Sequence, residues 1–121
     1  MTNAAVWFDI FTLDFDRAVK FYSTILGQDI EVREFNGKNL GFFPIQDNGV
    51  GGTIVPPGED LPSSDGTCIY LNVEGRIDEA LEKLEPAGGK ILNPKVFVPD
   101  FGWIAHIIDS EGNRVGLHSS S

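Results

Sequence analysis

The sequence predicts an α+β fold made of two tandem βαβββ modules. The order of expected strands and helices in the first half of the chain recurs in the second half. The two helical segments, DRAVKF at 16–21 and DEALEK at 78–83, lie one half-chain apart. A segment with three prolines and several turn-forming residues, PPGEDLPSSDG at 56–66, separates the halves and is typical of a linker.

The first half begins with an expected strand at 4–13, which is rich in aromatic and β-branched residues. Asp14 is a suitable N-cap for the helix that follows, and Gly27 is a suitable residue to end it. Asn36-Gly37 is the strongest short signal for a hairpin. Three strands are therefore expected after the helix, at about 28–35, 39–45 and 50–55.

The second half repeats this order, with a strand expected at 67–74 and a helix at 76–87. Glu79 and Lys83 form a favourable i,i+4 pair in that helix, and Pro86 disfavours its last turn. Further strands are expected at 90–98, 102–109 and 113–118. These assignments predict a single domain over residues 1–121, with module 1 at 4–55, the linker at 56–66 and module 2 at 67–118.

Composition limits the partners and the compartment. Eighteen acidic and nine basic residues give a formal charge of −9, which disfavours nucleic acid and anionic membranes as partners and would favour a cationic ligand. No apolar run is long enough to span a membrane, and the first residues lack the basic region of a secretory signal. The single cysteine excludes an internal disulfide. We therefore expect a cytoplasmic protein.

Three stretches of the chain resemble the superfamily of glyoxalase I, bleomycin-resistance proteins and extradiol dioxygenases, also called vicinal oxygen chelate proteins. They are FDIFTLDFDRAVKFYSTILG (8–27), VEGRIDEALEKLEPAGGKIL (73–92) and DSEGNRVGLH (109–118). The resemblance implies eight strands that curl around a central hollow, commonly within a homodimer. For members with a metal, it implies a divalent ion held there by His or Glu from the first and last strands of the modules. It does not fix the activity, because this fold hosts many chemistries.

The positions that the resemblance assigns to metal ligands hold other residues in this sequence. The first-strand histidine of the family falls at Trp7, and the last-strand glutamate falls at Gly116. The other two positions fall at Thr53 or Gly52 and at Cys68. Indole and glycine offer no metal-binding side chain, threonine is a poor ligand for divalent ions, and one thiol makes no site. The sequence therefore predicts no metal and no cofactor at the usual position.

The same register predicts which side chains line the hollow, because successive side chains of a strand point to opposite faces. If Trp7 faces the hollow, Asp9 and Phe11 do so too, while Phe8 and Ile10 pack beneath the helix. The expected lining residues are Trp7, Asp9, Phe11, Thr53, Cys68, Tyr70, Asn72, Ile104, His106, Arg114, Gly116 and His118. Apolar walls with a few polar groups are typical of a small-molecule pocket. A glycine at position 116 would leave room for a ligand or for the indole of Trp7.

Two interpretations stay open for several of these residues. Trp7 either stacks on a ligand or plugs the hollow, and Asp9 and Arg114 either serve a ligand or form an ion pair. His106 is a candidate general base with Asp9 as its orienting partner, or an ordinary structural histidine. Cys68 fits a small buried hydrophobe better than a nucleophile.

The function expected from these features is metal-free binding of a small aromatic or cationic molecule by a homodimer. Three alternatives remain. The first is a metal-dependent enzyme of the lactoylglutathione-lyase or dioxygenase type. The second is a metal-free enzyme that uses His106 and Asp9 as acid and base. The third is a scaffold or regulatory domain that acts through its surface.

Overall fold

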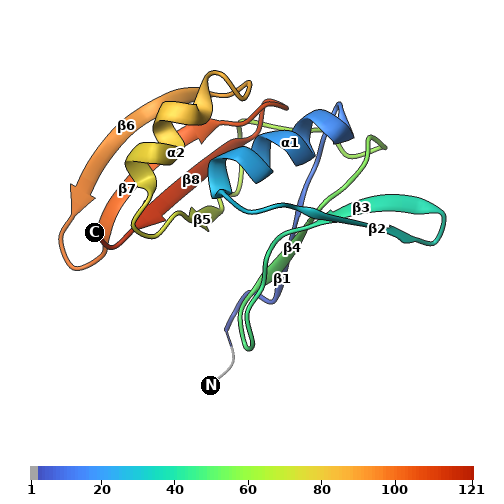
Figure 1. Ribbon diagram of the computed structural model, residues 1–121, viewed down its shortest axis with the longest axis horizontal. Coiled ribbons are helices and arrows are strands. Elements are labelled where there is room, and N and C mark those ends of the chain that lie inside the picture. Colours follow the sequence, from blue (N-terminus) through green and yellow to red (C-terminus); the bar gives the residue numbers. More distant parts are fainter. Residues whose placement is uncertain (1–2) are drawn as a thin grey trace.

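The structure, a computed structural model, describes residues 3–121 and contains two four-stranded sheets and two helices (Figure 1). The strand order is β1-β4-β3-β2 in the first sheet and β5-β8-β7-β6 in the second. In each sheet the first and last strands of a module pair in parallel, and the other neighbours are antiparallel. This repeated order confirms the predicted α+β fold of two βαβββ modules.

The first module contains β1 (Trp7–Ile10), α1 (Phe15–Leu26), β2 (Glu31–Phe35), β3 (Lys38–Phe42) and β4 (Gly51–Ile54). The carboxylate of Asp14 caps the first turn of α1, and Gly27 ends the helix with a φ of 68°. Asn36 and Gly37 have φ values of 52° and 79°, as a type I′ hairpin turn requires. The helix and the hairpin lie where they were predicted. β1 is shorter than the predicted 4–13, because only residues 7–10 pair with β4.

The second module contains β5 (Tyr70–Asn72), α2 (Ile77–Leu84), β6 (Lys90–Val98), β7 (Gly102–Ile108) and β8 (Arg114–Ser119). α2 ends before Pro86, whose ring and missing N–H disfavour a further turn. Lys83 Nζ lies 3.2 Å from Glu79 Oε1, as the sequence predicts. β5 pairs with β8 over three residues and is shorter than the predicted 67–74. Within residues 3–121, neither helix is long and apolar enough to cross a membrane.

The hydrophobic core lies beneath the two helices, which run side by side (Figure 1). Phe21, Tyr22 and Ile25 of α1 are fully buried there, together with apolar side chains of both sheets. Burial of each such side chain stabilises the fold by about 1.5–3 kcal/mol. Phe8 packs against this core and Ile10 is buried within it, as predicted. The strand residues that alternate with them face away from the helices.

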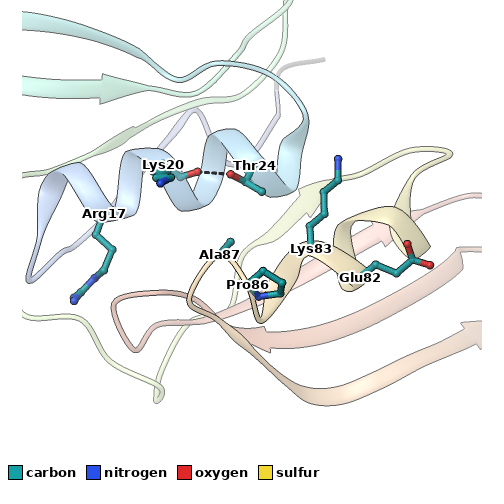
Figure 2. A pocket seen from close by; sticks show the side chains of 7 residues that line it. All are labelled: Arg17, Lys20, Thr24, Glu82, Lys83, Pro86 and Ala87. Atoms are coloured by element: carbon teal, nitrogen blue, oxygen red, sulfur yellow. Dashed lines mark hydrogen bonds between the residues drawn. The ribbon is translucent and has the colours of Figure 1, made fainter.

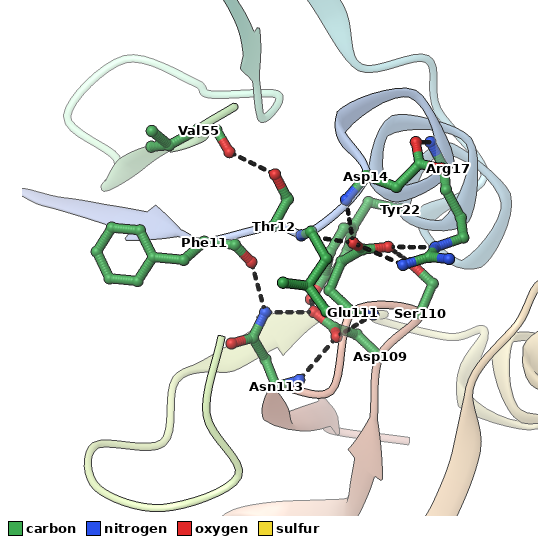
Figure 3. A network of polar contacts seen from close by, with 11 residues as sticks. Phe11, Thr12, Asp14, Arg17, Tyr22, Val55, Asp109, Ser110, Glu111 and Asn113 are labelled. Atoms are coloured by element: carbon green, nitrogen blue, oxygen red, sulfur yellow. Dashed lines mark hydrogen bonds and ion pairs between the residues drawn. The ribbon is translucent and has the colours of Figure 1, made fainter. Parts of the chain in front are cut away.

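A buried carboxylate joins the two modules where β1 leads into α1 (Figure 3). The side chain of Glu111 is fully buried, and its Oε1 accepts the backbone N–H groups of Leu13 and Asp14 at 2.8 and 2.7 Å. Its Oε2 lies 2.7 Å from Arg17 Nε. Burial alone would raise the pKa of Glu111, but the hydrogen bonds from Arg17, from Ser110 and from the two backbone groups outweigh it and hold the pKa at about 2.

Asp109 and Asn113 extend this network into the core (Figure 3). Tyr22 Oη donates to Asp109 Oδ2 at 2.5 Å, and Asn113 Nδ2 donates to the carbonyl of Phe11 at 2.9 Å. Burial and the neighbouring carboxylate raise the pKa of Tyr22. The C-terminal turn of module 2 therefore fixes the end of β1, which carries the first residues of the candidate site.

Candidate functional site

Trp7 of β1 lies over a glycine of β4. Trp7 and Gly51 are partners in the parallel ladder, and a Cβ at Gly51 would come within 2.5 Å of the indole. The lack of a side chain therefore makes room for the ring. Of the two residues considered for the fourth-strand position, Thr53 shares the face of Trp7. Gly52 lies under the ring of Phe8 on the core face.

Tyr70 of β5 lies over Gly116 of β8 in the same way. The two residues are ladder partners, and a Cβ at Gly116 would clash with the phenol ring. The room left by this glycine is therefore filled by Tyr70, which corrects the expectation that a ligand or Trp7 would fill it. The residue opposite Gly116 is Tyr70, and Cys68 stands two positions earlier, before the strand begins.

The side chains at these four positions do not fit a divalent metal ion. The positions hold an indole, a hydroxyl group, one thiol and a glycine that Tyr70 covers, and a single thiol makes no metal site. Within residues 3–121, no three His, Cys, Asp or Glu side chains converge on one point. We therefore derive no chemical step through a metal.

A short polar chain orients Trp7 in the first sheet. Trp7 Nε1 donates to Thr53 Oγ1 at 3.2 Å, and Thr53 Oγ1 donates to Asp9 Oδ1 at 2.5 Å. Phe42 meets the indole edge-on, with the ring centroids 6.3 Å apart. Trp7 remains 47% exposed. The indole is thus held in one orientation with a face available for contact.

A second polar chain stands at the matching place in the second sheet. Tyr70 Oη lies 2.7 Å from His106 Nε2, and Asn93 Nδ2 lies 3.3 Å from His106 Nδ1. Asp9 belongs to the other sheet and bonds Thr53, so the structure does not join it to His106. Sequence reasoning missed Asn93. Two register shifts interrupt the β6–β7 ladder near this residue, and strict alternation along β6 could not reveal them.

Five of the predicted lining residues meet at a cavity of about 530 Å³ beside β1. They are Trp7, Asp9, Phe11, Cys68 and Arg114. Leu61 and Ile69 extend its apolar wall. The cavity lies between β1, the segment that leads into β5, and the start of β8. Its volume lies within the range of about 300–1,000 Å³ that is usual for ligand pockets, and its lining combines apolar walls with few charges.

The other predicted residues lie outside this cavity. They are Thr53, Tyr70, Asn72, Ile104, His106, Gly116 and His118. Asn72 Oδ1 accepts the N–H of Glu74 at 2.8 Å, and His118 Nε2 lies 2.6 Å from the carbonyl of Phe101. Ile104 is the ladder partner of His118. Asp9 and Arg114, both in the described part of the chain, form no ion pair with each other.

A second hollow, of about 420 Å³, lies between α1 and α2 (Figure 2). It is lined by Arg17, Lys20, Thr24, Glu82, Lys83, Pro86 and Ala87. Arg17 and Lys83 are already held in ion pairs by Glu111 and Glu79. None of the predicted site residues lies in this hollow. We therefore place the candidate site at the cavity beside β1.

The chain matches a known family over most of its length. The model of the Glyoxalase/Bleomycin resistance protein/Dioxygenase superfamily matches residues 4–117. Proteins named "Putative glyoxylase CFP32", from Mycobacterium bovis and Mycobacterium tuberculosis, are 29% identical to it over 116 residues. The match covers 92% of this chain and 43% of those proteins, so the chain spans less than half the length of the curated relatives.

Solved structures of distant sequence share the fold. A glyoxalase/bleomycin resistance protein from Albidiferax ferrireducens T118 has a TM-score of 0.74 and 17% identity, covering 97% of this chain and 98% of that one. The fosfomycin resistance protein FosX from Listeria monocytogenes has a TM-score of 0.69 and 19% identity, covering 100% and 94%. These likenesses show the fold, and the family match over residues 4–117 shows that the chain belongs to the Glyoxalase/Bleomycin resistance protein/Dioxygenase superfamily.

Proposed function

We propose that this protein binds a small molecule without a metal ion, in the cavity beside β1. The cavity itself carries this conclusion, because it gathers Trp7, Asp9, Phe11, Cys68 and Arg114 around about 530 Å³. The usual ligand positions offer only one side chain suited to a divalent ion, the thiol of Cys68, and one thiol makes no site. Aromatic and apolar walls can still bind a ligand by burying its apolar surface.

Trp7 is the residue best prepared for such contact. Its hydrogen bond to Thr53 fixes the ring before a ligand arrives, so little rotamer freedom is lost on binding. Large aromatic side chains supply much of the contact energy in binding sites. The ligand is therefore expected to stack on Trp7 or to meet its edge.

A Trp103→Phe variant provides a direct test, because it leaves Trp7 as the single tryptophan of the chain. We expect small aromatic amides, amines and acids to include ligands that change the Trp7 emission. At ten times its Kd, a ligand specific for the native state adds about 1.4 kcal/mol of stability, or roughly 5 °C in Tm. Fluorescence titration and thermal unfolding measure the two effects.

Two variants of Trp7 serve as controls. Trp7→Ala should abolish the ligand-dependent shift in Tm, whereas Trp7→Phe should retain part of it because an aromatic face remains. A shift of equal size in the Trp7→Ala variant would place the ligand elsewhere and contradict the proposal.

The contacts of His106 favour a second candidate function, metal-free acid–base chemistry. An amide nitrogen only donates, so we infer that Asn93 Nδ2 donates to His106 Nδ1 and that the proton of the neutral ring is on Nε2. The Tyr70 oxygen then accepts from Nε2, and the phenol proton is free for a substrate oxygen. In this function Tyr70 touches the substrate, and His106 positions the hydroxyl group of Tyr70.

The tautomer of His106 can be measured by long-range ¹H–¹⁵N spectroscopy. In a His118→Gln background, His106 is the only histidine. We expect the Nε2–H tautomer in the neutral form, and a switch to Nδ1–H in Asn93→Asp, because a carboxylate only accepts. Finding Nδ1–H with Asn93 present would remove the basis for this second function.

The homodimer expected from the resemblance stays a prediction. Large apolar side chains on both sheets, such as Phe35 at 62% and Phe97 at 52% exposed, support an association that would cover them. Sedimentation velocity should give a mass near twice that of one 13.2 kDa chain. A monomer at micromolar concentration would contradict it.

A further inference from the structure

Arg114 differs from the other arginines in having no acidic partner. Arg17, Arg33 and Arg76 each lie within 2.8 Å of a carboxylate oxygen. No carboxylate in the described residues 3–121 lies within ion-pair distance of Arg114. This isolation occurs in a chain that has twice as many acidic as basic residues.

The guanidinium of Arg114 also has an unused donor. Its Nη2 donates to the carbonyl of Gly66 at 2.6 Å, which fixes the side chain against the segment before β5. Its Nε is buried and has no acceptor among the residues that the structure describes. A buried N–H of a charged group without an acceptor is costly, so it adds to the unusual environment of Arg114.

Arg114 is one of the residues that line the candidate cavity. Arg114 lines it together with Trp7, Phe11 and Ile69, so a cation stands beside aromatic and aliphatic walls. A guanidinium matches the planar geometry of a carboxylate and can donate to both of its oxygens. An apolar body with one acid group would satisfy the walls and the arginine together.

We propose that Arg114 binds the carboxylate of a small aromatic monocarboxylic acid in the cavity beside β1. This inference rests on the proposed function of that cavity and names the class of its ligand. Asp9 and Asp65 also line the cavity. Their charges oppose negative charge on a ligand, so a single carboxylate that pairs with Arg114 fits better than a phosphate dianion.

Three probes share a phenyl group on a short chain and differ in the charge of the terminal group. They are the anionic phenylacetate, the neutral phenylacetamide and the cationic phenethylamine. Isothermal titration calorimetry on the full chain should show phenylacetate binding at least tenfold more tightly than phenylacetamide. In Arg114→Gln this preference should fall to about twofold or less. Arg114→Lys should keep a part of it, because the charge remains while the forked geometry is lost.

A matched control removes one positive charge elsewhere. Lys38 is exposed at the start of β3, and Lys38→Gln should leave the tenfold preference unchanged. Unfolding midpoints of all variants establish that each one is folded. Because Arg114→Gln loses the bond to Gly66, Arg114→Lys serves as the second variant if the first is unstable.

Two results would overturn the inference. If phenylacetamide binds as tightly as phenylacetate with the Trp7 signal present, the cavity binds small molecules but Arg114 does not select acids. If the preference for phenylacetate survives in Arg114→Gln, another group recognises the acid. Failure of every aromatic amide, amine and acid to bind would instead contradict the proposed function itself.

Discussion

Replacing Glu111 by Gln is expected to lower the free energy of unfolding at pH 7 by about 2–3 kcal/mol. The buried carboxylate accepts from Arg17 and from the backbone of Leu13 and Asp14, and its pKa is held at about 2. Glutamine keeps one acceptor oxygen but removes the charge and turns one hydrogen-bond acceptor into a donor. Urea unfolding followed by circular dichroism measures the difference.

The pH dependence of this difference has a definite sign. The ordinary pKa of such a carboxyl is 4.5, so the unfolded chain takes up the proton at a higher pH than the folded one. The stabilisation is therefore fully present above about pH 5 and is lost as the pH falls toward 2. The gap between wild type and Glu111→Gln should be constant from pH 7 to 5 and should shrink between pH 4.5 and 2.

Glu79→Gln is the matched control for this experiment. This substitution also removes ion pairs, those of Glu79 with Arg76 and Lys83. The side chain of Glu79 is 47% exposed, so solvent screens these interactions. We expect a smaller change at pH 7. An equal loss of stability in the two variants would show that the network around Glu111 does not join the modules as described.

Replacing Gly116 by Ala is expected to destabilise the fold by about 1–3 kcal/mol. The new Cβ would meet the ring of Tyr70, and β8 cannot move aside because β5 and β7 pair with its two edges. The ring is itself fixed by its hydroxyl contact with His106. Thermal and urea unfolding of the purified variant measure the effect.

A double-mutant cycle shows whether Tyr70 is the cause. In a Tyr70→Ala background, Gly116→Ala should cost less than about 1 kcal/mol, because the atom it meets is gone. Gly58→Ala, in an open part of the linker, should be close to neutral. The same cost for Gly116→Ala with and without Tyr70 would contradict the packing of this ring on the glycine.

Most of the fold could be predicted because its signals are local. α1 begins after Asp14 and ends before Gly27, as predicted, and the Asn36-Gly37 turn adopts the backbone conformation that its two residues favour. The lengths of β1 and β5 could not be predicted, because they depend on how far each strand runs beside its partner. Ladder register is a tertiary property that composition does not encode.

The arrangement of the candidate site depends on the same tertiary information. Alternation along one strand grouped Trp7 with Asp9 and Phe11, but Phe8 and Ile10 of the same strand line the cavity as well. Pairing between distant strands decides that Tyr70 covers Gly116 and that Asn93 meets His106. The lack of a carboxylate partner at Arg114 can likewise be recognised only when the positions of the acidic side chains are known.

Metal independence of ligand binding is the central claim, and one measurement tests it most directly. Trp103→Phe protein is divided into a portion treated with EDTA and a portion incubated with Zn²⁺, Ni²⁺, Mn²⁺ or Fe²⁺, and each is analysed for bound metal and titrated with phenylacetate. Equal Kd values in all portions, with far less than one metal per chain, are predicted. One tightly bound metal ion per chain, with phenylacetate binding lost after EDTA and restored by that ion, would contradict the account.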